Sequence, residues 1–247
     1  FLPFAYGQIN FPVQTAVRYK IPLIFFGEDG DVEYGGSFDR FDKPNLDFQY
    51  TVKTKFTSLP PEYWKSFGIK NHELKKYSLP SLKEIKANKI EAHYFSYYNF
   101  WDPQEHYDVS KQKTGFKENP EGRSEGTYTD YASLDDKTDG FHYYMAFIKF
   151  GIGRATYDAA QEIRNEEITR EEGIALVKKF DGEFPGRFSE EIFEYLSIPE
   201  VEYPIASRCF DHPIIDREYF DNLADTFRSP HLWKREEDGW KLRHTVW

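Results

Sequence analysis

The stretch from Tyr131 to Arg164 constrains the fold of this chain more than any other, because it predicts two helices that meet at a glycine elbow. Gly151 and Gly153 interrupt the helical pattern, and Arg154 opens the second helix. Side chains spaced by three and four residues give the first helix one apolar or nearly apolar face. They are Leu134, Thr138, Phe141, Met145 and Ile148. We expect this face to pack on a core.

The two helix starts carry charges that point to a ligand. Ser133 followed by Asp136 is similar to a capping box, and Asp135 and Asp136 suit the positive end of a helix dipole. Arg154 is a cation in a first helical turn, which is unfavourable unless an anion lies nearby. The sequence therefore suggests a phosphate or carboxylate ligand. The alternative is an ordinary surface pair between Arg154 and Asp158, four residues apart.

Composition excludes several classes of protein. No apolar run is long enough to span a bilayer, and no signal-like segment opens the sequence. One cysteine, Cys209, excludes a disulfide framework within this chain and fits a reducing compartment. The formal charge of -10 argues against a general nucleic-acid binder. We therefore expect a cytoplasmic protein with no membrane insertion and no nucleic-acid partner.

The N-terminal part indicates the edge of an α/β sheet. A helix over Phe11–Tyr19 precedes the short apolar run Ile21–Phe26, which is typical of a buried parallel strand. The strand leads into the acidic, glycine-rich loop 27–36, and ligands of α/β sheets bind beyond such strand ends. Its carboxylates suit Mg²⁺ or a ribose. A solvated acidic turn is the alternative.

The middle of the chain is predicted to be an insertion of short helices followed by a second strand. Residues 38–89 are mixed and polar, with helical pieces over 62–67, 71–76 and 81–87. Ile90–Tyr97 is predicted to be a strand, and a helix follows from Trp101 to about Lys113. His93 and His106 have no third metal ligand at a recognisable spacing, so a metal site there is disfavoured.

The C-terminal half is predicted to be mostly helical. The loop from Lys117 to Thr129 contains Arg123 and Glu125 between glycines, as in segments that close over substrates, although a surface turn is equally compatible. Thr169 with Glu172 forms a capping box. Further helices are expected over 189–196 and 216–227, and a hairpin turns at Asp238-Gly239.

Several runs resemble the N-acetyl sugar amidotransferase family of the PP-loop ATP pyrophosphatase superfamily. They are FLPFAYGQINFPVQTAV, IPLIFFGEDGDVEYGG, WDPQEHY, GFKENPEGRSEGTY, YASLDDKTDGFHYY, IKFGIGRATYDAAQEIR, ITREEGIALVKKFDGEFP and FRSPHLW. They spread over most of the chain, and the run from Gly115 to Pro185 is the most specific.

The resemblance implies an enzyme that converts a sugar acetamido group to an acetamidino group in bacterial surface-polysaccharide (lipopolysaccharide, O-antigen) or nonulosonic acid pathways. ATP would adenylylate the acetamido oxygen, and ammonia from a partner glutaminase would displace AMP from the resulting imidate. The family's N-terminal Ser-Gly-Gly-x-Asp-Ser phosphate loop and its preceding cysteine pairs are absent from this sequence. We expect those residues to precede Phe1, since the loop supplies the amides that hold pyrophosphate.

The resemblance also implies a fold and two domains. Residues 1–115 would be the remainder of a Rossmann-like, parallel-sheet PP-loop nucleotide domain with an insertion at about 38–89. Residues 116–247 would be a mostly helical substrate domain that ends in a β-hairpin. Gly27, Glu28, Asp31 and Glu33 would border Mg-ATP, with Mg²⁺ held by Asp31 and Glu33.

Site roles follow from the same reaction. Arg154, helped by Lys149 and Arg123, would neutralise phosphate or a sugar carboxylate, and Glu125 would lie on the closing loop. Asp135 or Asp136 would orient hydroxyls, hold Mg²⁺ or accept a proton, and Lys137 would serve the leaving phosphate. His142 is either a proton shuttle or a packed core residue.

Two other classes stay open. The chain could be a non-catalytic substrate-binding or glutaminase-docking subunit, or another PP-loop enzyme such as one that modifies tRNA. The acidic charge weighs against tRNA. A homodimer is compatible with the sequence, which does not name the sugar.

Overall fold

The computed structural model describes residues 2–28, 37–54, 60–197 and 213–247. The chain divides into two compact units, residues 1–101 and 102–247. The sequence placed the boundary near residue 115 instead. The difference is helix α6 (Pro103–Thr114), which lies with the second unit.

The first unit is built on a long helix and two parallel strands. Helix α1 (Leu2–Tyr19) is longer than the predicted helix and contains Pro12 in its interior. Strand β1 (Leu23–Phe26) pairs in parallel with β2 (Glu91–Tyr94), with Leu23 opposite Glu91. The predicted parallel strands are thus confirmed among the described residues. Their membership of a PP-loop nucleotide domain stays a prediction.

Strand β1 is not the fully buried strand that its apolar sequence indicates. Alternate residues of a strand face opposite sides, and here Leu23 is 44% and Phe25 49% exposed. Ile24 faces the other way and packs against a cluster of Val13, Ala16, Ile85 and Ile90. Only one face of β1 therefore contributes to the core of this unit.

Short helices fill the region between β1 and β2. They are η1 (Phe38–Arg40), α3 (Phe48–Thr54), η2 (Pro61–Phe67), α4 (Asn71–Leu74), η3 (Lys75–Tyr77) and α5 (Leu82–Ala87), with η4 (Phe95–Tyr97) after β2. Helix α5 begins with the predicted capping box, in which the Ser81 hydroxyl accepts a hydrogen bond from the Glu84 amide.

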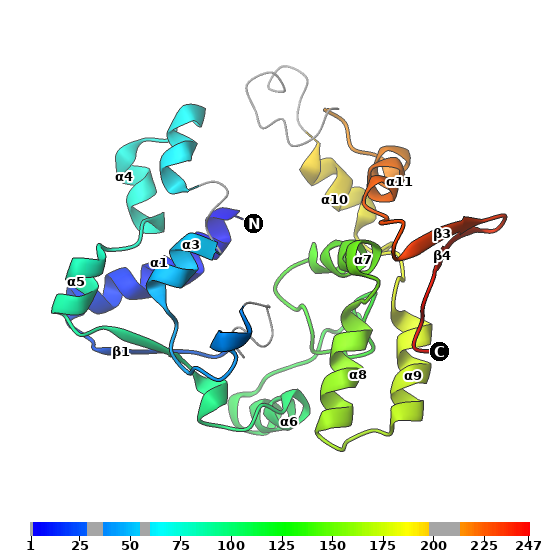
Figure 1. Ribbon diagram of the computed structural model, residues 1–247, viewed down its shortest axis with the longest axis horizontal. Coiled ribbons are helices and arrows are strands. Elements are labelled where there is room, and N and C mark those ends of the chain that lie inside the picture. Colours follow the sequence, from blue (N-terminus) through cyan, green and yellow to red (C-terminus); the bar gives the residue numbers. More distant parts are fainter. Residues whose placement is uncertain (1, 29–36, 55–59, 198–212) are drawn as a thin grey trace. The chain divides into compact units, whose positions relative to one another are not determined.

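The second unit is mostly helical and ends in a hairpin, as predicted (Figure 1). After α6 come α7 (Asp139–Phe150), α8 (Arg154–Arg164), α9 (Arg170–Phe180), α10 (Ser189–Leu196), α11 (Arg217–Thr226), β3 (Trp233–Glu236) and β4 (Gly239–Leu242). Helices α8 and α9 lie side by side. Thr169 and Glu172 form the predicted capping box at the start of α9.

Helix α7 provides the centre of this unit. Its buried Phe141 and Ile148 pack against side chains of α10 and α11, including Phe193 and Phe220. The indole nitrogen of Trp233 donates a 2.7 Å hydrogen bond to the carbonyl of Ile148, which ties the hairpin to the same helix. The core therefore fixes α7, whose first turn borders a cavity.

Among the described helices, no segment is both long enough and apolar enough to cross a membrane.

Candidate functional site

A cavity of about 470 Å³ lies where the loop 117–125 and the turn 133–137 meet the start of α7. Its lining comprises Lys117, Glu118, Asn119, Pro120, Glu121, Ser124, Glu125, Ser133, Leu134, Asp135, Asp136, Lys137, Gly140 and Phe188. Four residues predicted to belong to a site, Glu125, Asp135, Asp136 and Lys137, thus share one cavity. We call it the acidic pocket.

The turn before α7 differs from its predicted structure. Helix α7 begins at Asp139, so Leu134 and Thr138 precede the helix. Ser133 has a left-handed backbone (φ 58°), which is incompatible with the extended conformation of an N-cap residue. The Asp136 carboxylate instead accepts 2.7 Å hydrogen bonds from the amide and the hydroxyl of Thr138. The predicted capping box at Ser133 is therefore wrong, and Asp136 closes a tight turn beside the pocket.

The loop 117–126 is held in place by residues that follow α9. Arg123 donates two hydrogen bonds to the Glu183 carboxylate, at 2.6 and 2.8 Å, and the Gly126 amide donates a third. Hydrogen bonding to Arg123 lowers the pKa of Glu183. The Arg187 amide donates a 2.8 Å bond to Glu125. Arg123 thus anchors the loop, instead of offering a free cation to a ligand.

Most charged groups in the lining of the pocket are carboxylates, one of which, Glu118, is ion-paired with Lys111. The lining holds five carboxylates and two lysines. Lys137 donates hydrogen bonds to both carboxylate oxygens of Glu191, at 2.9 and 2.8 Å, and Glu191 is not among the residues that line the pocket. Among the described residues, no hydrogen bond or ion pair engages the exposed Asp135 carboxylate. Carboxylates repel phosphate and attract hydroxyl donors and cations. The pocket therefore suits a polyhydroxylated or cationic group.

Asp139 is a neighbouring carboxylate that the sequence analysis missed. It is the first residue of α7 and is only partly exposed. Burial raises its pKa, and the charges of Asp136 and Asp135 act in the same direction, whereas the hydroxyl of Ser133 and the ring of His142 lower it. The run of three aspartates before Phe141 is the signal that could have found it. His142 is exposed, so the packed core position considered for it is wrong.

Arg154 finds its anion within the protein. Its guanidinium donates a 2.8 Å bond to Asp158, whose side chain is 12% exposed. Burial raises the pKa of Asp158, and Arg154 and the Thr127 hydroxyl oppose that shift. The Asp181 carboxylate accepts hydrogen bonds from the amides of Gly153 and Thr156, so it occupies the N-terminus of α8. The pair considered as the alternative is therefore present, and the start of α8 is already capped.

The other predicted site residues lie elsewhere. Lys149 is on the last turn of α7, roughly 15 Å along the helix from Asp139. Gly27 and Glu28 follow β1, and Glu28 accepts a 3.0 Å hydrogen bond from Gln8. Asp31 and Glu33 lie outside the described residues. Within the described ranges, no three histidine, cysteine or acidic side chains converge as metal ligands.

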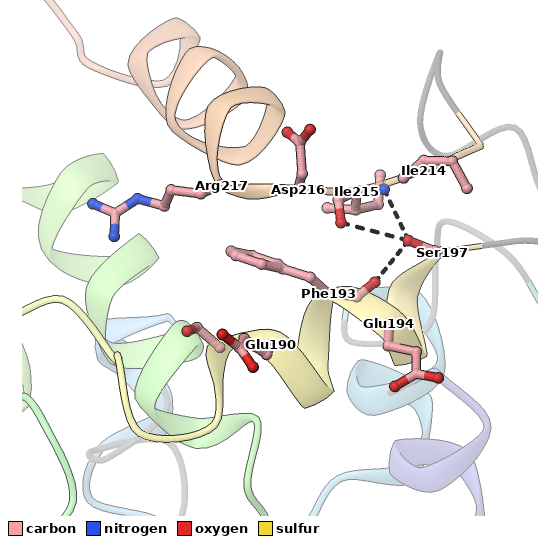
Figure 2. A pocket seen from close by; sticks show the side chains of 9 residues that line it. Glu190, Phe193, Glu194, Ser197, Ile214, Ile215, Asp216 and Arg217 are labelled. Atoms are coloured by element: carbon pink, nitrogen blue, oxygen red, sulfur yellow. Dashed lines mark hydrogen bonds between the residues drawn. The ribbon is translucent and has the colours of Figure 1, made fainter.

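A second cavity, of about 630 Å³, lies between α10 and the start of α11. Figure 2 shows the Ser197 hydroxyl bridging the carbonyl of Phe193 and the backbone of Ile215 at its edge. Asp216 caps α11 through the Tyr219 amide. Ser197 and Asp216 thus serve helix ends, and none of the predicted site residues lines this cavity.

Glu167 gives the unit a pH-dependent stability. Burial, together with the charges of Asp102 and Glu162, raises its pKa to about 6. Because the folded pKa lies above the unfolded one, the stabilisation is complete below about pH 4.5 and is lost as the pH rises through 6. We expect Glu167→Gln and the wild type to have the same free energy of unfolding at pH 4, where Glu167 is protonated. At pH 7.5 the variant should be more stable, because glutamine carries no charge. Solvent screens this exposed group, so the gain should be at most about 1 kcal/mol.

Urea unfolding of both proteins across this pH range measures the difference. The neighbouring exposed Glu166→Gln supplies the background. A gain for Glu167→Gln that does not change with pH would contradict the expectation.

Comparison with known families adds one match. Residues 125–246 match the family model described as LPS biosynthesis protein WbpG-like, C-terminal domain. The matched range begins at Glu125 in the pocket and includes α7 to β4. No curated protein matches the chain. The C-terminal unit is thus similar to a domain of lipopolysaccharide biosynthesis proteins.

Proposed function

We propose that this protein is an ATP-dependent amidotransferase that acts in the biosynthesis of a bacterial surface polysaccharide. It replaces the oxygen of a sugar acetamido group by nitrogen, giving an acetamidino group. The match of residues 125–246 to a lipopolysaccharide biosynthesis domain supports the pathway. The resemblance to N-acetyl sugar amidotransferases supports the reaction.

The composition of the acidic pocket is the observation that carries this proposal. An acetamido group is neutral, whereas an acetamidino group is a cation at neutral pH. Carboxylates of the pocket, including Asp135 and Asp136, therefore attract the product, and the charge developing towards it, more strongly than the substrate. Carboxylates also accept hydrogen bonds from sugar hydroxyls, while Phe188 and Leu134 offer apolar surface to a sugar ring.

ATP is proposed to bind in the first unit. Gly27 and Glu28 lie at the carboxyl end of β1, where ligands of parallel sheets bind, and a carboxylate there fits a ribose or Mg²⁺. ATP supplies the leaving group that an amide oxygen lacks. Asp31 and Glu33 remain the proposed Mg²⁺ ligands. Ammonia is proposed to come from a partner glutaminase in the cytoplasm.

The test is an assay with ATP, isotope-labelled ammonium and a panel of UDP-linked and free N-acetylated hexosamines and hexuronic acids. Mass spectrometry would detect a product in which labelled NH replaces oxygen. We expect product that depends on both ATP and an acetamido sugar. Release of pyrophosphate with tRNA and without sugar would contradict the proposal.

Pocket variants test the contribution of the carboxylates. We expect Asp135→Asn and Asp136→Asn each to lower kcat by about 10- to 100-fold, because a negative charge near the developing amidinium is removed. Asn at position 136 keeps an oxygen for the Thr138 hydrogen bonds. Glu171→Gln, on the exposed start of α9, is the matched control. Wild-type kcat in both pocket variants would contradict a role of these carboxylates in stabilising the developing amidinium.

A further inference from the structure

Residues 183–188, which precede α10, border the acidic pocket, and we call them the 183–188 segment. Pro185 lies against the first turn of α7, where Gly140 leaves room for it: an added Cβ at Gly140 would lie 2.8 Å from the Pro185 Cβ. Phe188, at the end of the segment, lines the cavity. The segment therefore packs on the helix whose start borders the pocket. Its contacts with the loop 117–126 help to set the shape of the cavity.

Glu183 fixes the backbone around Glu125. Its carboxylate accepts two hydrogen bonds from Arg123 and a third, of 3.1 Å, from the Gly126 amide. The Arg123 guanidinium also donates a 3.2 Å hydrogen bond to the Ser124 carbonyl. One ion pair thus holds the residues immediately before and after Glu125. Glu183 therefore determines where the backbone places the Glu125 side chain.

The Glu125 carboxylate uses only one of its two oxygens within the protein. Oε1 accepts a 2.8 Å hydrogen bond from the Arg187 amide, and the Arg187 guanidinium donates to the Glu121 carbonyl of the same loop. In the parts of the chain that the structure describes, no hydrogen bond or ion pair reaches Oε2. This oxygen lies towards Gly140, 4.0 Å from an added Cβ there, and both residues line the cavity. Glu125 therefore presents one fixed oxygen to the pocket.

The chemistry of this oxygen defines what it can bind. An ionised carboxylate oxygen accepts hydrogen bonds but cannot donate them, so its ligand must bring a donor. A sugar in the pocket brings hydroxyls. Asp135 and Asp136, assigned above to the developing amidinium, line the cavity from another segment, the turn before α7. A side chain that is already held in place loses little conformational freedom on binding, which favours recognition of the substrate itself.

We propose that Glu125 is a substrate-binding residue that accepts a hydrogen bond from one hydroxyl of the sugar, and that Glu183 is its positioning residue. The proposal rests on the function proposed above, because it needs a sugar in the acidic pocket. It makes Glu125 a determinant of specificity, since a sugar without that hydroxyl leaves the fixed oxygen unpaired. Glu125 makes and breaks no bond of the sugar, so it stabilises substrate and transition state equally.

Glu125→Gln is the first test, because its amide oxygen can still accept the Arg187 amide while an N–H group replaces Oε2. We expect the KM for the sugar to rise about tenfold with kcat unchanged, because a charge-assisted hydrogen bond becomes a neutral one. The Kd of the sugar, measured by calorimetry with αβ-methylene ATP, which cannot transfer AMP, should rise by a similar factor. Glu171→Gln removes a carboxylate from the start of α9 and should leave both constants at their wild-type values.

A set of sugar analogues, each with one hydroxyl replaced by hydrogen, identifies the contact. For one analogue the KM values of the wild type and of Glu125→Gln should agree within about twofold, because the hydroxyl that the carboxylate binds is gone. For the other analogues the difference between the two proteins should persist. An equal difference for every analogue would overturn the hydroxyl contact.

Glu183→Gln tests the positioning role. We expect KM to rise about fivefold with kcat unchanged, because the amide holds Arg123 less firmly and Glu125 loses its alignment. In the Glu125→Gln background the same change should leave KM as it is, since Glu183 acts through Glu125. A residue with only a structural role would raise KM in both backgrounds and for every analogue. If Glu125→Gln fails to fold, Glu183→Gln with the analogue series tests the same contact.

The outcomes separate this proposal from the proposed function. A wild-type protein that binds the sugar but forms no acetamidine would overturn the function, and the Kd values would still decide the role of Glu125. Acetamidine formation with a wild-type KM in Glu125→Gln would overturn that role alone, as would a lowered kcat at an unchanged KM. Additive effects of the two variants would overturn positioning by Glu183. A protein that neither binds nor converts any sugar would overturn both proposals.

Discussion

Replacing Gly182 by alanine is expected to lower the free energy of unfolding by about 3 kcal/mol, the sum of backbone strain and overpacking. Gly182 has a φ of +78°, and an added Cβ would lie 2.4 Å from the ring of Phe147. That ring packs edge to face on Trp233, with centres 5.4 Å apart. Trp233 is itself hydrogen-bonded to the carbonyl of Ile148, so the ring has little room to move away.

The matched control is Gly115→Ala in the same unit. Gly115 also has a left-handed backbone, at +74°, but an added Cβ would meet nothing within 4 Å. This variant should therefore lose only the backbone contribution, about 1–2 kcal/mol. Chemical denaturation of both variants measures the difference. Equal losses would mean that Phe147 moves aside freely, contrary to its packing on Trp233.

Replacing Asp181 by alanine is expected to cost about 2 kcal/mol of stability, because it removes charge-assisted hydrogen bonds at a helix start. The carboxylate accepts bonds from the amides of Gly153 and Thr156, at 2.9 and 3.2 Å, and from the Thr156 hydroxyl. Those amides begin α8 and lose their acceptor in the variant. Thermal or urea unfolding followed by circular dichroism measures the loss.

Thr169→Ala is the comparison for an ordinary cap. Thr169 caps α9 through one amide of its own helix, that of Glu172, so its loss should cost about 1 kcal/mol. Asp181 is itself the residue that follows α9, and it is hydrogen-bonded to the start of α8. Its removal therefore also loosens the contact between the two helices. A cost for Asp181→Ala no larger than that for Thr169→Ala would be inconsistent with this bridging role.

The caps explain why the cationic site expected from the sequence is absent from the acidic pocket. Arg154 does need an anion in the first turn of α8, as its position indicates. Asp158, on the same helix, and Asp181, from the end of α9, supply that negative charge. Arg123 is likewise satisfied by Glu183, 60 residues further along the chain. These guanidinium groups stabilise the fold around the pocket, which leaves carboxylates as its dominant charges.

The sequence alone was sufficient for features that depend on near neighbours. The capping boxes of α5 and α9, the start of α6 at Asp102-Pro103 and the hairpin at Asp238-Gly239 all form as predicted. Each depends on hydrogen bonds or backbone preferences within about four residues, so the pattern contains the whole interaction. Asp135, Asp136 and Lys137 lie close together for the same reason, because they are consecutive in the sequence.

Only the tertiary structure decided which charges are paired and which side chains share the pocket. Ser133 is suited to a helix cap by sequence, but its hydrogen bond to Tyr143 accompanies a left-handed backbone instead. The basicity of Asp139 depends on its burial. Ion pairs and desolvation depend on how closely distant segments approach, and the folding of the whole unit sets that approach. The sequence therefore determined where the chemistry-bearing residues lie along the chain, and packing determined what surrounds each of them.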